Sequence, residues 1–245
     1  MGHVFDFNEA VNYEQWLNKP QNKLAFELET QLMRDLLQPM RGESVLDIGC
    51  GAGACLTAFL EMGLRVTGLD PSTYMLDMAL EKIGHRADLY RGYAEDLPFD
   101  DNSFNYACLF TTLEFVADPK KALQEAFRVT KDRVFIGVFN RYALKGIQRR
   151  VKGMFTSTIF NHAQFFSVWE LTRILRTILG DVPITWRTVC HVSETPGRYL
   201  SHFEKFWIVQ RCPFGAFAGL VVALTLFVLH NAALVIELFL RHRTQ

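Results

Sequence analysis

Short apolar runs alternate with segments of helical periodicity between residues 43 and 140. The strand-like runs lie at 44–49, 65–70, 87–91, 104–110 and 133–139. The helix-like segments lie at 54–62, 72–83 and 119–130, and Asp118 is suited to be the N-cap of the last one. Strands and helices that alternate at this spacing predict a mostly parallel sheet covered by helices. We therefore expect an α/β, doubly wound fold.

The pattern changes on both sides of this region. A leucine recurs at every fourth residue within 23–37, which predicts an amphipathic helix. A basic amphipathic helix is expected at 141–155, and the pair Ser167 and Glu170 has the spacing of a capping box that opens another helix. The chain is thus expected to consist of an N-terminal helical cap (1–40), a βα core (41–140), a helical insertion (141–183) and last strands with an apolar tail (184–245).

Composition excludes several classes of function. Lys plus Arg and Asp plus Glu both number 26, so the formal net charge is zero and no overall field draws the chain onto nucleic acid. The 5 cysteines contain no C-x-x-C pair and the 7 histidines show no metal-ligand spacing, so we expect no metal. With no secretory leader evident, the cysteine pattern favours a reducing compartment and a cytoplasmic location.

The segment VLDIGCGAG at 45–53 carries the most chemical information. An apolar strand runs into Gly49, Gly51 and Gly53, which permit a sharp turn and the close approach of a ligand to the backbone. Two ligand classes use such a turn, because Gly49, Gly51 and Ala54 also satisfy the dinucleotide pattern G-x-G-x-x-G/A. Asp47 would repel a pyrophosphate but suits a cationic amino-acid group, which favours S-adenosylmethionine. Asp70, at the end of the next strand, suits a ribose in either class.

Three successive motifs resemble those of the class I S-adenosylmethionine-dependent methyltransferases, in the subgroup similar to quinone-biosynthesis and related small-molecule methyltransferases. They are VLDIGCGAG at 45–53, GLDPSTYML at 68–76 and the long segment that begins with GYAEDLPF at 92–99. The resemblance implies a seven-stranded Rossmann-like sheet whose last strand is antiparallel. It also implies contacts to the donor from Asp47, Gly49, Gly51 and Gly53 (methionine part), Asp70 (ribose), Ala94 and Glu95 (adenine edge), Thr111, and the aromatic pair Tyr13 and Trp16.

The sequence departs from this family at two places. Tyr93 stands where many members carry an acidic residue for the adenine amino group, so Glu95, Asp96 or the backbone is expected to make that contact. Glu114 and Phe115 stand where a pair of histidines is common. No catalytic base is assigned, and Glu114 and His162 are the candidates if the acceptor must lose a proton.

The resemblance implies in-line methyl transfer to a small-molecule acceptor. We expect an apolar or amphiphilic acceptor, because 141–180 combines a basic face with several aromatic residues. Contact with a membrane surface through 141–155 and 228–240, and a homodimer, are further hypotheses. The alternatives are a non-catalytic, membrane-associated binding module with the same fold and a nicotinamide-dependent oxidoreductase.

The C-terminal tail allows two interpretations. Residues 212–236 contain no formal charge, and this run exceeds the roughly 18 residues that suggest a transmembrane helix. The family's sheet, however, needs a last antiparallel strand, and 215–226 has the composition of a strand buried on both faces. We therefore expect a strand at 215–226 followed by a short apolar helix at 228–240, with C-terminal membrane anchoring as the alternative.

Overall fold

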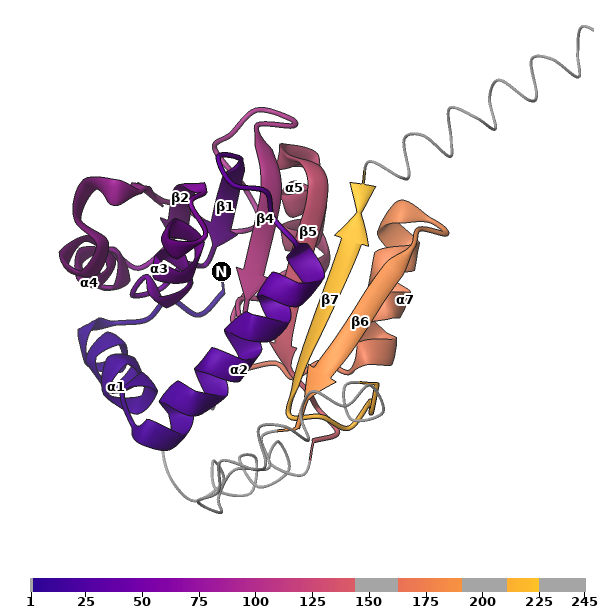
Figure 1. The fold of residues 1–245 in the computed structure, drawn as a ribbon, viewed down its shortest axis with the longest axis horizontal. Helices are drawn as coiled ribbons and strands as arrows, with labels where there is room; N and C mark the ends of the chain where they lie inside the picture. The colour runs from indigo at the N-terminus through magenta and orange to yellow at the C-terminus, as the bar shows by residue number, and fades with distance from the viewer. Residues whose placement is uncertain (1, 144–162, 191–210, 225–245) are drawn as a thin grey trace, which may run out of the picture.

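The computed structural model describes residues 2–143, 163–190 and 211–224. Within them, seven strands form one sheet in the order β3-β2-β1-β4-β5-β7-β6 (Figure 1). The strands are β1 (Ser44–Ile48), β2 (Arg65–Asp70), β3 (Asp88–Arg91), β4 (Phe104–Phe110), β5 (Thr130–Phe139), β6 (Ile184–Val189) and β7 (Phe217–Ala223). β1 to β5 pair in parallel, whereas β7 is antiparallel to both β5 and β6. The predicted α/β, doubly wound, mostly parallel sheet is confirmed.

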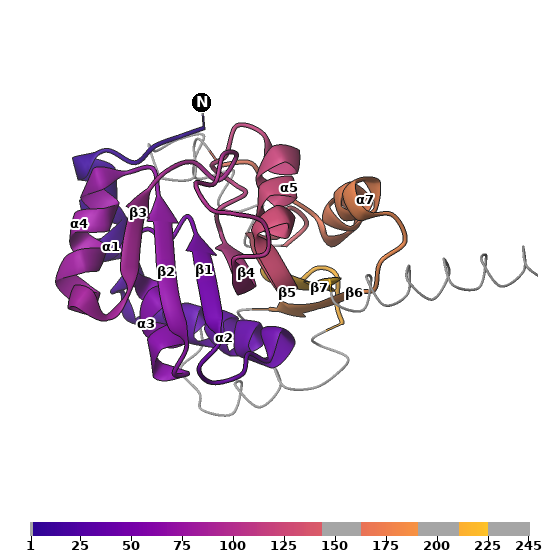
Figure 2. The same cartoon turned by 90° about the horizontal axis from the view of Figure 1, so that it is seen from above.

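Helices cover both faces of this sheet (Figure 2). They are α1 (Phe7–Leu17), α2 (Pro20–Leu37), α3 (Ala54–Glu61), α4 (Thr73–Ile83), α5 (Pro119–Val129) and α7 (Val168–Leu179). Met33 of α2, Phe59 of α3 and Ala79 of α4 belong to the buried cluster on one face. Leu123 of α5 and Leu171 of α7 belong to the cluster on the other face. Two apolar cores therefore hold the sheet between them.

The N-terminal helices begin at clear local signals. At α1, Asp6 Oδ1 accepts a hydrogen bond from Glu9 N (2.8 Å) and Glu9 Oε2 accepts one from Asp6 N (3.0 Å), which forms a capping box. The helix expected at 23–37 begins slightly earlier, because Pro20 occupies the first turn of α2. α2 lies across β5 and β7 (Figure 1), so it covers this part of the sheet.

The apolar segment of the tail enters the sheet as β7. Leu220 and Val222 point into the core that contains α5 and α7, and Phe217 and Val221 point into the opposite core. A strand buried on both faces has a continuous apolar sequence, which explains why it resembled a membrane span. The expected strand is confirmed as β7, which runs from Phe217 to Ala223 within the predicted range 215–226. Among the described residues, no helix is long and apolar enough to cross a membrane.

Several predictions concern residues that the structure does not describe. The basic helix expected at 141–155 lies outside the described residues except for its first three positions, and the apolar helix at 228–240 lies wholly outside them. His162 also falls outside. The helix opened by Ser167 is described: it runs to Leu179, and Ser167 Oγ accepts a hydrogen bond from Glu170 N (3.2 Å).

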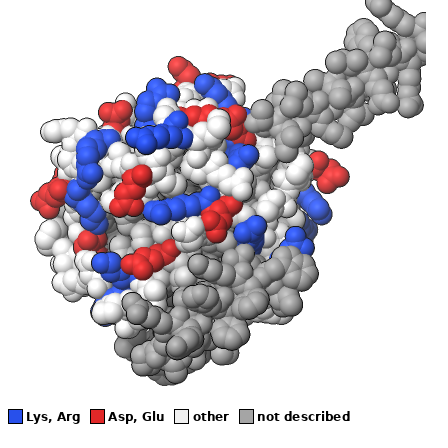
Figure 3. Space-filling view, viewed as in Figure 1, with Lys and Arg blue, Asp and Glu red and all other residues white. Residues whose placement is uncertain are grey.

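Charges of both signs are mixed on the face of the molecule seen in Figure 3. Within the described residues of that face, lysine and arginine side chains alternate with aspartate and glutamate and neither sign forms a continuous patch. This distribution matches the balanced composition of 26 basic and 26 acidic residues.

Candidate functional site

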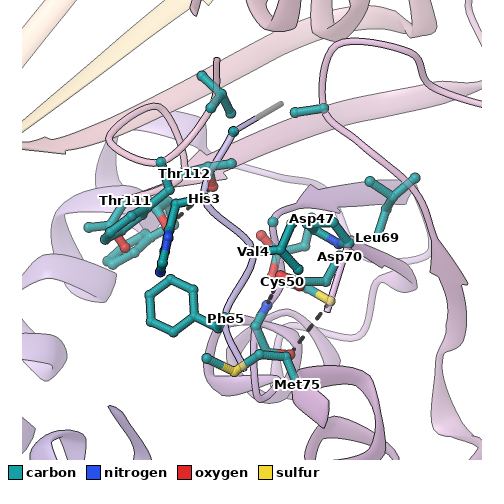
Figure 4. Close-up of a pocket in the computed structure, with 18 of the residues that line it drawn as sticks. His3, Val4, Phe5, Asp47, Cys50, Leu69, Asp70, Met75, Thr111 and Thr112 are labelled. Carbon is teal, nitrogen blue, oxygen red and sulfur yellow. Dashed lines mark hydrogen bonds between the residues drawn. The ribbon is translucent and has the colours of Figure 1, made fainter. Parts of the chain in front are cut away.

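A cavity opens at the carboxyl ends of the central strands, where the strand order reverses between β1 and β4. Open α/β sheets bind their ligands at such a switch point, because the loops on its two sides diverge. The wall is formed by the turn after β1, the end of β2, residues 93–95, the end of β4 and residues 2–5. Figure 4 shows the carboxyl groups of Asp47 and Asp70 on one side of this cavity and Thr111 and Thr112 on the other.

The turn after β1 has the backbone that its glycines permit. Gly49, Gly51 and Gly53 have φ of 74°, 50° and 79°, in the left-handed region. At Gly51 an added Cβ would find Met75 Sδ at 3.9 Å as its nearest neighbour, so the backbone here faces open space. At Gly49 the Cβ would lie 2.5 Å from Thr112 Cγ2, so this glycine allows the β1 turn to pack on the end of β4.

Gly53 was expected beside the methionine part of the donor, but it packs against α4 and not at the cavity wall. It is the residue before α3, and its Cβ would meet Ala79 Cβ of α4 at 3.2 Å. It is buried and is not among the residues that line the cavity. Its role is therefore the close packing of α3 on α4, and a direct contact to a ligand stays a prediction.

Asp47 is a buried carboxyl group at the base of the cavity. Only 1% of the residue is exposed, and neither carboxyl oxygen has a hydrogen-bond partner among the described residues. Burial, and then the nearby charge of Asp70, raises the pKa of Asp47 to about 8. A buried charge without a partner is costly. A cationic ligand group would supply the missing partner, whereas a pyrophosphate would add repulsion.

Asp70 connects the two loops that flank the cavity. Its Oδ2 accepts a hydrogen bond from Gly51 N (2.9 Å) and its Oδ1 accepts one from Ser72 N (2.9 Å). Burial raises the pKa of Asp70 to about 6, against the opposing effect of these two hydrogen bonds. The carboxylate lines the cavity at the end of β2, where an acidic residue can accept hydrogen bonds from the hydroxyl groups of a ribose.

The residues expected at the adenine edge also line the cavity, together with Tyr93. Ala94 is buried. Glu95 Oε1 accepts hydrogen bonds from Ala117 N (2.8 Å) and Asp118 N (3.3 Å), so this carboxylate holds the loop between β4 and α5. That structural task was not foreseen from the sequence. A contact between Glu95 and the adenine of a donor stays a prediction.

Thr111 and Tyr13 line the cavity, whereas Trp16 does not. Thr111 has φ of 54° although it is not glycine, and its N–H donates to Gly137 O (2.8 Å), which holds this strained residue at the end of β4. Tyr13 stacks on Trp16 with ring centroids 6.1 Å apart. Trp16 packs against the core under α2 and α3. Tyr13 thus faces the cavity and Trp16 supports it from behind.

Glu114 is not placed to act as a base in this cavity. It is fully buried, is not among the lining residues, and its Oε1 accepts a hydrogen bond from Phe139 N (2.7 Å). Burial raises the pKa of Glu114 to about 8. The side chain points toward the backbone of β5 because the chain turns after Thr112, so proximity to Thr111 in sequence was misleading. A role of Glu114 as the base therefore stays a prediction that these contacts do not support.

Residues 2–5 form part of the site that sequence reasoning missed. Gly2, His3, Val4 and Phe5 line the cavity. Figure 4 shows His3 beside Thr112, with Val4 and Phe5 following along the same segment. His3 Nε2 lies 2.9 Å from Glu9 Oε1. The only local signal was the D-x-x-E spacing of Asp6 and Glu9, which predicts a helix start but not a position over the cavity.

Together these features define a class of protein. The cavity combines an open glycine turn, a carboxylate suited to ribose and a buried acid that has no partner among the described residues. The set fits a nucleoside that carries a cationic amino-acid arm, which is the chemistry of S-adenosylmethionine. A dinucleotide would place a pyrophosphate beside Asp47, which its charge opposes.

Comparison with known proteins agrees with this class. Residues 46–136 match a family model described as a methyltransferase domain. The chain is 31% identical over 178 residues to the uncharacterized protein MJ1123 of Methanocaldococcus jannaschii, covering 72% of this chain and 80% of that protein. It is 39% identical over 105 residues to demethylmenaquinone methyltransferase of Renibacterium salmoninarum, covering 41% of this chain and 42% of that one.

A solved structure supports the same conclusion. A Thermotoga maritima S-adenosylmethionine-dependent methyltransferase, described as a possible histamine N-methyltransferase, superposes with a TM-score of 0.67 and 25% identity, covering 86% of this chain and 94% of that one. The present chain belongs to the class I S-adenosylmethionine-dependent methyltransferases, and S-adenosylmethionine is its methyl donor. Its match to the demethylmenaquinone methyltransferase spans less than half of that relative, so the acceptor is a separate question.

Proposed function

We propose that this protein transfers the methyl group of S-adenosylmethionine in line to a small apolar or amphiphilic acceptor. The observation that carries the proposal is the apolar part of the wall of the cavity that also contains the two acids. Phe26 and Phe110, with ring centroids 5.6 Å apart, line it together with Phe115. Demethylmenaquinone methyltransferases among the relatives are named for a quinone acceptor, which supports a flat apolar ring as the substrate class.

The residues of this chain would act mainly by binding and orientation. When bound, the donor supplies a methyl group already activated by a sulfonium, so the protein needs no metal or covalent intermediate for this step. We assign the cationic arm to Asp47 and the turn at Gly49 and Gly51, and the ribose to Asp70. The apolar wall would hold the acceptor and exclude water, and orientation of this kind contributes about 7–11 kcal/mol to catalysis.

Three further assignments belong to the same proposal. Ala94 and Glu95 would lie along the adenine edge, and Thr111 would lie beneath the donor. Tyr13 would close the site from α1, with Trp16 as its support. Burial, with smaller effects from nearby acids that include Glu29 and Asp47, raises the pKa of Tyr13. Its hydroxyl is therefore neutral at physiological pH and can serve as a hydrogen-bond donor but not as a base.

The amphiphilic character of the acceptor has a second support. Tyr142, Trp169 and Phe214 lie side by side at the end of the sheet beyond β5, with ring centroids 5.8 Å and 6.2 Å apart. Trp169 and Phe214 are 53% and 58% exposed. Aromatic side chains of this kind are enriched at membrane interfaces. We propose that this aromatic patch contacts a membrane surface and thereby brings the site close to amphiphilic acceptors.

One experiment tests the proposed function directly. The protein is incubated with methyl-labelled S-adenosylmethionine and a cell extract that has been divided into aqueous and solvent-extractable fractions. We expect label in a small, solvent-extractable product and stoichiometric formation of S-adenosylhomocysteine. Donor binding without label transfer to any fraction would instead favour a non-catalytic binding module. Tight binding of NADH without binding of the donor would contradict the assignment of the cavity.

A further inference from the structure

An N-terminal strap, residues 2–5, crosses the cavity and is fixed at both ends. His3 N donates a hydrogen bond to Phe115 O (2.8 Å), in the loop after β4. At the other end, Ser72 Oγ donates to Phe5 O (2.7 Å), and Ser72 is itself held by Asp70. A Cβ at Gly2 would lie 2.5 Å from Phe115 O, so the strap packs directly on that loop. The backbone of His3 is therefore held in place independently of its side chain.

The side chain of His3 has a positioned acidic partner. Glu9 Oε1 lies 2.9 Å from His3 Nε2, while Glu9 Oε2 accepts the Asp6 N–H of the capping box. Because the ionised carboxylate only accepts hydrogen bonds, Nε2 carries the hydrogen and Nδ1 is the nitrogen with proton-accepting capacity. The start of α1 thus determines which tautomer of His3 is present. An imidazole whose far nitrogen is bound to a carboxylate has the arrangement of a general base.

Aromatic rings flank this imidazole. The His3 ring lies 5.4 Å from Phe5, edge to face, and 6.4 Å from Phe115. All three residues line the cavity that contains Asp47, Asp70 and Thr111. Flat walls beside a proton-accepting nitrogen suit an aromatic ring that carries a hydroxyl group, since edge and face contacts with such rings are favourable.

From this geometry we propose that His3 is a catalytic residue that removes the proton of a phenol-like acceptor hydroxyl, and that Glu9 is the residue that positions it. The inference rests on the proposed function and deepens it. In the step, the acceptor forms a bond to the methyl carbon through its oxygen, or through a ring carbon activated by that oxygen. The carbon–sulfur bond breaks with its electron pair on sulfur, which yields S-adenosylhomocysteine, and the hydroxyl proton passes to His3 Nδ1.

Other titratable groups line the same cavity and would also affect how the methyl-transfer rate depends on pH. Apart from Glu9, those that line the cavity wall with His3 are Tyr13, Asp47, Cys50, Cys55, Asp70, Tyr93 and Glu95. Burial raises the pKa of both thiols, so they stay protonated at neutral pH. The test therefore compares variants of the same protein rather than interpreting one profile alone.

The test uses His3→Gln and Glu9→Gln in the whole 245-residue chain, with His85→Gln as the matched control on an exposed histidine. Glutamine at position 9 preserves the capping box, which accepts Glu or Gln, so α1 should remain intact. Thermal unfolding and calorimetric binding of S-adenosylhomocysteine check the fold and the donor site. The acceptor probe is 1,4-dihydroxynaphthalene with methyl-labelled donor. A second probe, 4-nitrophenol, is added to the complex with S-adenosylhomocysteine, and its absorbance reports the ionised fraction.

We expect His3→Gln to bind S-adenosylhomocysteine within about threefold of the parent and to transfer label about 100-fold or more slowly. The pH profile of the transfer rate should also differ between this variant and the parent. Glu9→Gln should lower the rate about tenfold with unchanged unfolding temperature. The parent should raise the ionised fraction of 4-nitrophenol, and both variants should do so less. His85→Gln should match the parent throughout.

Several outcomes overturn the inference. Parent and His3→Gln transferring label at the same rate, or showing the same pH profile, would exclude His3 as the base. A loss confined to S-adenosylhomocysteine affinity would make the strap a donor cover only. A parent protein that labels extract components but neither methylates nor ionises the hydroxyl probes would exclude a phenol-like acceptor. Failure of the proposed function looks different, because the parent would then transfer no label at all.

Discussion

The two halves of the sheet's carboxyl edge differ in what they offer to a ligand. In the half formed by β1, β2 and β4, two buried acids and an open glycine turn face a cavity. In the half beyond β5, Tyr142, Trp169 and Phe214 are about half exposed and face outward. Asp47, a buried acid that has no hydrogen-bond partner among the described residues, favours a specific cationic ligand, whereas exposed aromatic rings suit a non-specific apolar surface. The first half therefore selects the methyl donor that binds, and the second half is suited to contact with an apolar surface outside the molecule.

The largest effect is expected from Gly49→Ala in the first half. The new Cβ would lie 2.5 Å from Thr112 Cγ2 in a residue with φ of 74°, so both the clash and the backbone strain oppose folding. We expect a loss of about 3 kcal/mol or more in the free energy of unfolding, and no donor binding. Denaturant unfolding and calorimetry measure the two effects.

Gly42→Ala is the matched control for this change. Gly42 also has positive φ, 85°, but an added Cβ has no neighbour within 4 Å. The Gly42→Ala variant should lose only about 1–2 kcal/mol of the free energy of unfolding, from backbone strain, and should bind the donor as tightly as the parent. Equal destabilisation by the two substitutions would mean that the contact between the β1 turn and Thr112 is unimportant.

The next effect is expected from Asp70→Ala. The change removes the acceptor of Gly51 N and Ser72 N as well as the proposed ribose contact. Because hydrogen bonds to a charged group are worth about 1.5–3 kcal/mol each, donor affinity should fall about 100-fold. Calorimetry with S-adenosylmethionine measures this, and Asp88→Ala, at an exposed position in β3, is the control. Unchanged affinity in Asp70→Ala would refute the ribose assignment.

Asp47→Asn should change the pH dependence of stability. The pKa of Asp47 is raised from 3.8 to about 8, so between these values the folded state keeps a proton that the unfolded state has lost. Stability therefore falls as pH rises through this window, by up to about 1.4 kcal/mol per pH unit for one group. The variant should lose this part of the slope in denaturant unfolding at pH 5 to 8. The variant should keep the part of the slope that Glu114 and Asp70 contribute, because the pKa values of these two groups are also raised.

The same variant tests the charge complementarity of the donor site. A cationic group beside Asp47 favours the ionised carboxylate, so affinity of the parent for S-adenosylmethionine should rise with pH up to about 8. In Asp47→Asn this rise should be reduced and the affinity at pH 8 should be lower. A variant with the parent's pH dependence would show that the titrating group lies elsewhere.

The smallest effect on donor binding is expected in the second half of the edge. Trp169→Ala combined with Phe214→Ala removes two exposed rings whose centroids lie 6.2 Å apart. Donor affinity should stay within about twofold, while flotation with anionic vesicles should decrease, because aromatic residues stabilise interfacial binding. Tyr74→Ala, an exposed ring on α4, is the control. Vesicle binding that does not respond to the double change would refute the membrane role of the patch.

Much of the donor half could be predicted from the sequence because its signals are local. The strand at Ser44–Ile48, the glycines that follow it and the acid at Asp70 are each recognised within about ten residues, and strand and helix periodicity placed them on one edge of a sheet. The family resemblance then assigned the ligand. None of these inferences required knowledge of which distant segments touch.

The remaining features depended on contacts between residues far apart in the chain. The tail segment that becomes β7 has a composition suited to a membrane helix or a buried strand, and its hydrogen bonds to β5 and β6 decided between them. Glu114 follows the cavity residues in sequence, yet the turn after Thr112 directs it to Phe139 N. His3 has no periodic pattern around it, and its bonds to Phe115 and Glu9, which no local signal predicts, place it over the site. Local propensity is encoded in neighbouring residues, whereas the direction of a single side chain is decided by packing across the whole fold.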